Sequence, residues 1–153
     1  MGLESEKKST KEIVDEYKDC VTEIAKYLPW LESKKDADMV SQYKPGDSDG
    51  TLAIPVFDPT LLQFIKLLEK SGRLDKNYDY VYKRYRIYSE EDEISLIHRA
   101  QITDMGMLFA VLSKYVIKGR TKSEFWKKGV SNGAFCEAVK KMKELIEFWD
   151  MPI

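Results

Sequence analysis

The stretch that decides the fold runs from Ile102 to Trp149 and reads ITDMGMLFAVLSKYVIKGRTKSEFWKKGVSNGAFCEAVKKMKELIEFW. Its first half repeats apolar side chains at spacings of three and four residues, which places them on one face of a helix. These residues are Met105, Leu108, Phe109, Leu112, Tyr115 and Val116. The second half resumes the same period at Phe135, Val139, Met142, Leu145, Ile146 and Trp149. The stretch therefore predicts two amphipathic helices joined by a corner.

Capping signals set the expected limits of these two helices. Thr103 stands where a side chain can cap the start of the first helix. Gly119 follows the last apolar residue of that helix, which is typical of a left-handed stop residue. Thr121 precedes Glu124 by three residues, the spacing of a capping box, so a new helix is expected there.

Upstream, four further segments have helical spacing and clear start signals. Ser9 and Glu12 form a capping-box pattern, Asp58 precedes Pro59, and Ser89 precedes four acidic residues. Gly72 is expected to end the helix that begins at Asp58. The predicted helices span residues 9–28, 58–72, 78–88 and 89–101, and the last of them is expected to continue into the Ile102 stretch.

Two weaker signals lie between the first two of these helices. Residues 36–43 have the spacing of a short helix, and Pro55 excludes a helix interior within residues 52–57.

The chain has 153 residues, of which 43% are hydrophobic, so it can bury one core. We predict an all-α protein: residues 1–153 form a single domain, an irregular bundle of five to seven helices. One short extended segment is expected at 52–57, and residues 1–8 are expected to be frayed.

Charge and cysteine content indicate a cytoplasmic protein. The net charge is -1, which predicts no overall attraction to nucleic acid or to an anionic membrane. The segment 111–145 differs, because it holds nine basic residues and three acidic ones. Cys20 and Cys136 have no metal-binding or redox spacing, so we expect free thiols in a reducing compartment. The acidic start leads us to expect no signal peptide, and no apolar run approaches the roughly 20 residues that a membrane span needs.

No motif in the sequence specifies catalysis. His98 is the only histidine, and no nucleophile motif accompanies it, so an ordinary surface or half-buried histidine is the favoured interpretation. Four consecutive acids, Glu90 to Glu93, point around a helix rather than together, and their place in a first turn explains them without a metal ion. We therefore predict no catalytic residue, no metal site and no cofactor.

A tyrosine-rich segment offers a different kind of surface. Five of the nine tyrosines lie between Tyr78 and Tyr88, interleaved with Lys83, Arg84 and Arg86. Aromatic and basic side chains in alternation suit base stacking and phosphate contact. They also arise when tyrosines lie at the rim of a core with their hydroxyl groups in water. Phe125 and Trp126, adjacent at the corner, are expected to anchor the core.

Three groups of residues resemble an uncharacterised family of small, mainly bacterial helical proteins. The first runs from Val56-Phe57-Asp58-Pro59 through Gly72 to Tyr78-Asp79-Tyr80. The second is the Leu108-to-Gly119 helix, whose end reads Tyr115-Val116-Ile117-Lys118-Gly119-Arg120-Thr121. The third is Trp126 with Gly133, Phe135, Ala138, Val139 and Met142. The resemblance covers about residues 55 to 146 and implies a helical, cytoplasmic protein without an assigned activity. This chain departs from the family at Tyr80, where a tryptophan is usual, and in a corner with fewer arginines.

The favoured function is a non-enzymatic module that binds a protein partner or a second copy of itself. Its predicted ligand or partner surface comprises Tyr80, Tyr82, Arg84, Arg86, His98, Arg120 and Trp126. One alternative is a nucleic-acid-associated protein that uses Lys83, Arg84, Arg86, Arg120, Lys127 and Lys128. The other is an enzyme whose cleft, around His98, is assembled by the fold from Asp79, Asp104 and Arg120.

Overall fold

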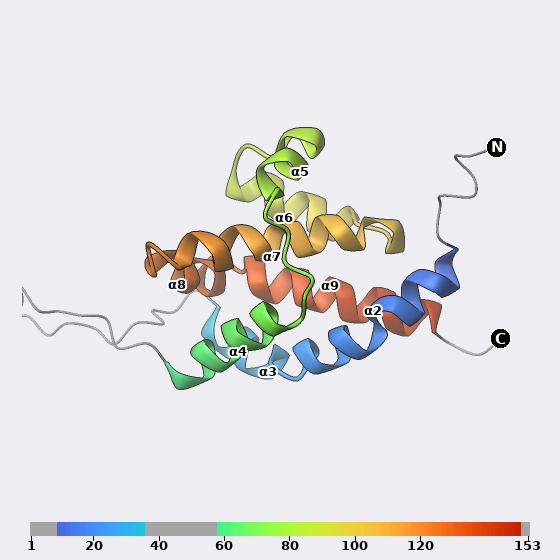
Figure 1. Ribbon diagram of the computed structural model, residues 1–153, viewed down its shortest axis with the longest axis horizontal. Coiled ribbons are helices and arrows are strands. Elements are labelled where there is room, and N and C mark those ends of the chain that lie inside the picture. Colours follow the sequence, from blue (N-terminus) through green and yellow to red (C-terminus); the bar gives the residue numbers. More distant parts are fainter. Residues whose placement is uncertain (1–8, 36–57, 151–153) are drawn as a thin grey trace, which may run out of the picture.

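The computed structural model describes residues 9–35 and 58–150, and these residues form eight α-helices, one 3-10 turn and no strand. The helices are α2 (Thr10–Ala25), α3 (Leu28–Lys34), α4 (Pro59–Lys70), α5 (Tyr78–Tyr85), α6 (Glu90–Arg99), α7 (Met105–Gly119), α8 (Glu124–Ser131) and α9 (Ala134–Trp149), with the 3-10 turn η2 (Ile102–Asp104) before α7. The all-α prediction is confirmed (Figure 1). The expected five to seven helices are too few. The predictions for residues 1–8, 36–43 and 52–57 lie outside the described residues.

The additional helix α3 arises at a proline. We expected the first helix to end before Pro29, but the chain turns at Lys26 and Tyr27 and enters α3 with Pro29 in its first turn. A proline in that turn removes no helical hydrogen bond, because the first amides of a helix have no partner within it. Pro29 therefore lies in the first turn of a new helix, and α2 has already ended at Ala25.

The chain also breaks between α6 and α7, where one continuous helix was expected. Ala100 and Gln101 adopt extended backbone conformations and η2 follows them. Gln101 and Asp104 form a reciprocal cap around this turn, so the cap predicted at Thr103 is wrong. The capping box predicted at Thr121 and Glu124 is also wrong, because Thr121 Oγ1 donates to the carbonyl of Lys118.

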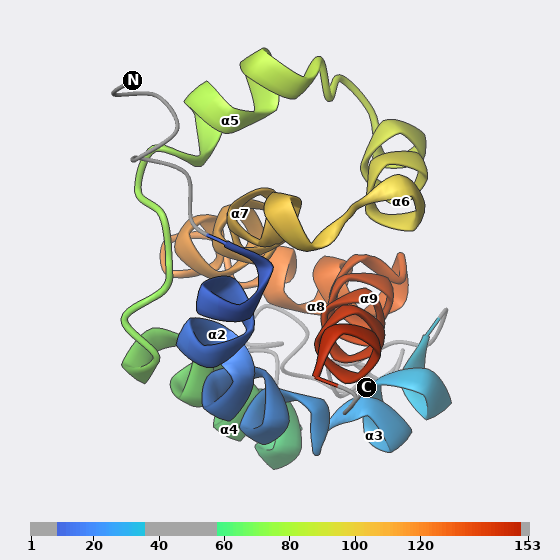
Figure 2. The same cartoon turned by 90° about the vertical axis from the view of Figure 1, so that its right-hand side faces the viewer.

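Helices α7 and α9 form the centre of the bundle. In Figure 2, α9 lies between α6 on one side and α2 and α3 on the other, with α7 beside it. The predicted apolar face of α7 is buried throughout. The predicted face of α9 is buried at Phe135, Val139, Met142 and Ile146, whereas Trp149 is 48% exposed beside the exposed ring of Phe148. None of the described helices is long and apolar enough to cross a membrane.

Most of the remaining helix limits are as predicted. Ser9 and Glu12 form the capping box of α2, and Asp58 Oδ1 accepts a hydrogen bond from the amide of Thr60 at the start of α4. Ser89 caps α6, and Gly72 follows α4 with a φ of +73°. Local sequence signals thus set these helix ends.

Both cysteines are free thiols, as expected.

Gly119 serves a different purpose from the predicted one. It is buried in the last turn of α7, and Arg120 continues in right-handed conformation. A Cβ at position 119 would overlap the indole ring of Trp126, whose Nε1 donates to the carbonyl of Val116 at 2.9 Å. Glycine is needed here because α8 brings an aromatic ring onto the backbone of α7. Trp126 anchors this corner, as predicted.

Candidate functional site

A buried carboxylate lies among three helices that form one side of the bundle. Glu93 in the first turn of α6 is 1% exposed, whereas its neighbours Glu90 and Glu91 are exposed. The ribbons of α5, α6 and α7 stand apart in Figure 2. Polar side chains join these helices across the space between them. The expectation that the four acids serve only as a charged helix start is therefore wrong for Glu93.

Both oxygens of Glu93 accept hydrogen bonds. Tyr115 donates to Oε1 at 2.6 Å, while Tyr82 and the Lys114 ammonium group donate to Oε2 at 2.7 and 2.9 Å. Burial, and then the negative charge of Glu93, raise the pKa of both tyrosine hydroxyl groups far above their ordinary value, so both remain protonated donors. The buried charge is thus fully partnered, as a stable core requires.

Asn132 connects this network to the protein surface. Its Nδ2 donates to the hydroxyl oxygen of Tyr115 at 2.9 Å, and its Oδ1 accepts from the amide of Ala134 at 2.8 Å. The second bond caps the start of α9 and fixes which end of the amide faces Tyr115. Gly133, with a φ of +87°, allows the sharp turn between α8 and α9 that places Asn132 there.

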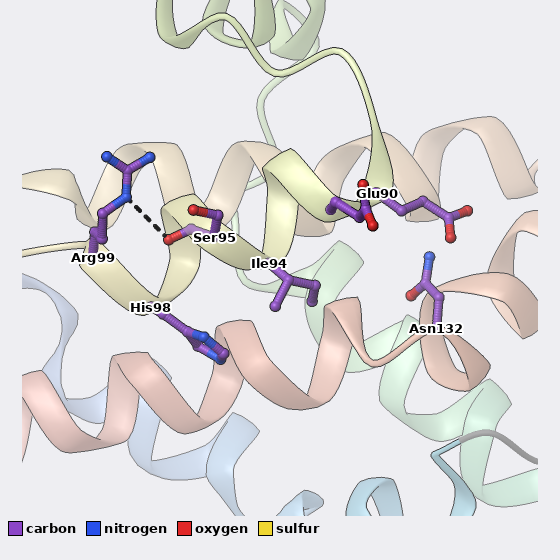
Figure 3. Close-up of a pocket in the computed structure, with 7 residues that line it drawn as sticks. Glu90, Ile94, Ser95, His98, Arg99 and Asn132 are labelled. Atoms are coloured by element: carbon purple, nitrogen blue, oxygen red, sulfur yellow. Dashed lines mark hydrogen bonds between the residues drawn. The ribbon is translucent and has the colours of Figure 1, made fainter.

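The same Asn132 lines a surface hollow of about 620 Å³ beside α6. The other lining residues come from the exposed face of α6: Glu90, Glu91, Ile94, Ser95, His98 and Arg99. In Figure 3, Ile94 and His98 point toward α9, and Glu90 faces Asn132 at the far end. The hollow therefore has an apolar centre, an acidic end and a basic end.

His98 forms a second polar cluster at the basic end. Its Nε2 lies 2.9 Å from Glu137 Oε1 on α9, and Lys35 Nζ lies 3.2 Å from Glu137 Oε2. Burial alone would raise the pKa of Glu137, but the hydrogen bonds and charges of His98 and Lys35 outweigh it and lower this pKa below its ordinary value. Glu137 thereby ties α6 and the end of α3 to the first turn of α9.

Replacing Glu137 with glutamine is expected to lower the free energy of unfolding by about 1 kcal/mol at neutral pH. Because the pKa is lower in the folded state, the carboxylate stabilises the fold above its ordinary pKa of about 4.3, and this contribution is lost as the pH falls through the folded value. Urea unfolding between about pH 5.5 and pH 3 should show the two proteins converging. Glu144→Gln, an exposed change on the same helix, is the control. A difference that stays constant with pH would contradict this role.

The seven residues predicted as a partner surface are not gathered in one place. Tyr80 and Arg84 are exposed on α5, Arg86 is exposed just after it, and His98 lies in the α6 hollow. Tyr82 is buried against Glu93 and so belongs to no surface. The last two residues lie at the corner between α7 and α8. There Arg120 pairs with Glu69 at 3.0 Å and Trp126 packs over Gly119.

The tyrosine-rich segment is partly buried and partly exposed. Tyr78 and Tyr82 are buried, Tyr80 and Tyr88 are exposed, and Tyr85 is half-buried with its hydroxyl group 3.1 Å from Asp104 Oδ1. The stacking surface needed for nucleic acid is correspondingly reduced. Basic side chains of the C-terminal half are also engaged, since Lys128 pairs with Glu90 at 3.1 Å and Lys114 with Glu93.

Comparisons with known proteins add nothing to this geometry: no family model, curated protein or solved structure matches the chain. The resemblance of residues 55–146 to a helical family therefore stays a prediction from the sequence. The site rests on its own contacts.

Sequence reasoning missed Glu93, Lys114, Asn132 and Glu137. A usable signal existed for Glu93, since it precedes Ile97 by four residues and Ala100 by seven and so shares their buried face. Tyr115 also lies on a buried stripe, and its hydroxyl group needs a partner there. For Glu137 and Lys35, 102 residues apart, no local pattern predicts the contact.

Proposed function

We propose that this chain is a cytoplasmic protein-interaction module whose docking surface is the exposed face of α6. The observation that carries the proposal is the hollow of about 620 Å³ beside that helix, with Ile94 at its centre and opposite charges at its ends. An apolar floor with charged rims is the usual composition of a surface that accepts an amphipathic helix. The Glu93 network supports the proposal, because it holds α6 in one position without using its outer face.

The charges on this face specify the chemistry of the partner segment. Glu91 and Arg99 form no ion pair with any residue in the described ranges 9–35 and 58–150. They lie eight residues apart, a distance of about 12 Å along the helix. A helical segment that runs antiparallel to α6, with a basic residue near Glu91 and an acidic residue near Arg99, would neutralise both. Pairing of this kind determines orientation and partner choice.

A photo-crosslinking amino acid at position 95 tests the proposal in the host cell. Ser95 lies on the exposed face between the two charged ends, so a crosslinker there should capture one discrete protein segment. The same amino acid at Lys66, exposed on α4, is the matched control. Glu91→Arg added to the position-95 protein should lower the yield of the adduct about tenfold, because it places a like charge against the partner. An adduct pattern that is the same from both positions would refute the assignment.

The His98–Glu137 pair supports a second candidate, an enzyme that uses acid–base catalysis. A histidine oriented by a carboxylate beside an open hollow is an arrangement that general bases use. The carboxylate is Glu137 and not the expected Asp79 or Asp104, and Asp104 instead accepts from Tyr85 and from the amide of Gln101. Turnover in a hydrolase substrate screen should then disappear in both His98→Ala and Glu137→Gln. Turnover that persists in both variants excludes this site.

A further inference from the structure

The outer face of α6 has charges in an order that makes it complementary to a second copy of itself. Two rows of side chains, each at spacings of four residues, run along this face. One row is Glu90, Ile94 and His98, and the other is Glu91, Ser95 and Arg99. Each row begins with an acid and ends with a histidine or an arginine. Both ends of the first row are already paired within the chain, Glu90 with Lys128 and His98 with Glu137. The second row therefore carries the complementarity, because a helix turned end for end would present Arg99 to Glu91.

We infer that the partner segment of the proposed interaction module is α6 of a second copy of this chain, packed antiparallel about a two-fold axis near Ser95. This inference rests on the proposed function, since it uses the same face. With the axis at Ser95, Glu91 of each copy lies opposite Arg99 of the other, so one geometry forms two identical ion pairs. A two-fold interface requires this self-complementarity, in which each contact occurs twice.

Side-chain size at the crossing point agrees with this arrangement. Ser95, at the axis, is small and exposed, which allows two helices to approach closely. Ile94 lies in the neighbouring row, is half-buried and points toward α9, so it borders this contact. The order of acids before bases also stabilises the α6 helix through its dipole. The dipole supplies no ion-pair partner, however, and Glu91 and Arg99 have none among the described residues. The second copy supplies those partners.

The size of the face predicts a weak dimer. The contact surface consists of one helix of 10 residues with Asn132 beside it. Its area is small compared with the roughly 800 Å² that each partner buries in a standard interface. We expect a dissociation constant on the order of 10–100 µM, so monomer and dimer should both be populated in concentrated solution. Sedimentation equilibrium over a concentration series measures this directly.

Two charge reversals test the pairing. E91R brings a second guanidinium group opposite Arg99 of the other copy, and R99E brings a second carboxylate opposite Glu91, so each variant alone should dimerise about tenfold more weakly. An equimolar mixture of the two variants should form a heterodimer with wild-type affinity, because arginines then face glutamates at both positions. The double variant E91R/R99E should also regain wild-type affinity. K66E, on the exposed face of α4, should change nothing.

The mixture also separates a true effect from misfolding, because neither variant could restore dimerisation unless both were folded. A wild-type protein that stays monomeric at about 1 mM overturns the inference, and so does a dimer that both single variants leave unchanged. The crosslinking experiment at position 95 tests the proposed function independently of the dimer. A discrete adduct of another protein at position 95 in a monomeric chain would keep the docking face and replace the partner.

Discussion

Replacing Glu93 with alanine is expected to lower the free energy of unfolding by about 3–5 kcal/mol, the largest single effect we predict for a polar residue. The change leaves the Lys114 ammonium group, whose side chain is 22% exposed, without its counter-charge. It also leaves the hydroxyl groups of Tyr82 and Tyr115 without an acceptor inside the core. Unsatisfied buried groups of this kind retain their full desolvation cost. Urea unfolding monitored by tryptophan fluorescence measures the loss.

Two further variants show whether the loss arises from the network. Glu91→Ala changes an exposed acid in the same helical turn and should alter stability by no more than about 0.5 kcal/mol. Combining Glu93→Ala with Tyr82→Phe should cost less than the sum of the single changes, because the tyrosine hydroxyl has already lost its acceptor in the first variant. Strict additivity, or a Glu93→Ala loss as small as that of Glu91→Ala, would show that the carboxylate is dispensable.

Replacing Gly119 with alanine is expected to lower the free energy of unfolding by about 2–3 kcal/mol, although alanine has the better helix propensity. The added methyl group would overlap the indole ring of Trp126, which is held by its hydrogen bond to the Val116 carbonyl. To make room, the ring must leave its position or α8 must move away from α7. Thermal unfolding of the variant should therefore show a clear fall in the midpoint temperature.

Gly106 provides a matched control on the same helix. A Cβ at Gly106 would meet no atom within 4 Å, so Gly106→Ala should stabilise the protein by about 0.5–1 kcal/mol. Trp126→Ala removes the obstruction, and in that background Gly119→Ala should cost little or nothing. If Gly119→Ala still lowered stability there by the same amount, the close approach of the ring would not be its cause.

The limits of prediction from the sequence follow from the range of each interaction. Caps at Ser9, Asp58 and Ser89 act within three residues, and the buried face of α7 is visible as a period, so both could be predicted. Gly119 has a local explanation as a stop residue and a tertiary one, the ring of Trp126. Only the fold distinguishes these explanations, because φ and the neighbouring atoms are not properties of the local sequence.

The candidate site is predictable to a smaller extent. His98 was singled out from the sequence and does line the hollow. Tyr82 was wrongly assigned to the expected surface, because its ring is buried and its hydroxyl group bonds to Glu93. Acidic residues in a first helical turn are explained by their favourable interaction with the helix dipole. That explanation fits all four acids equally, so it does not indicate that Glu93 is buried. Contacts between α6, α7 and the turn before α9 depend on how three helices pack, and no spacing within one helix contains that information.

Hydrogen exchange of the α6 amides tests most directly the central claim, that the Glu93 network holds this helix and its docking face in place. In Glu93→Ala, the α6 amides should exchange roughly 100-fold faster than in the wild type, since about 3 kcal/mol of local stability is lost. Amides of α2 and α4, which do not touch the network, should lose a smaller share of their protection. Equal loss of protection along all helices, or unchanged protection of α6, would contradict the account.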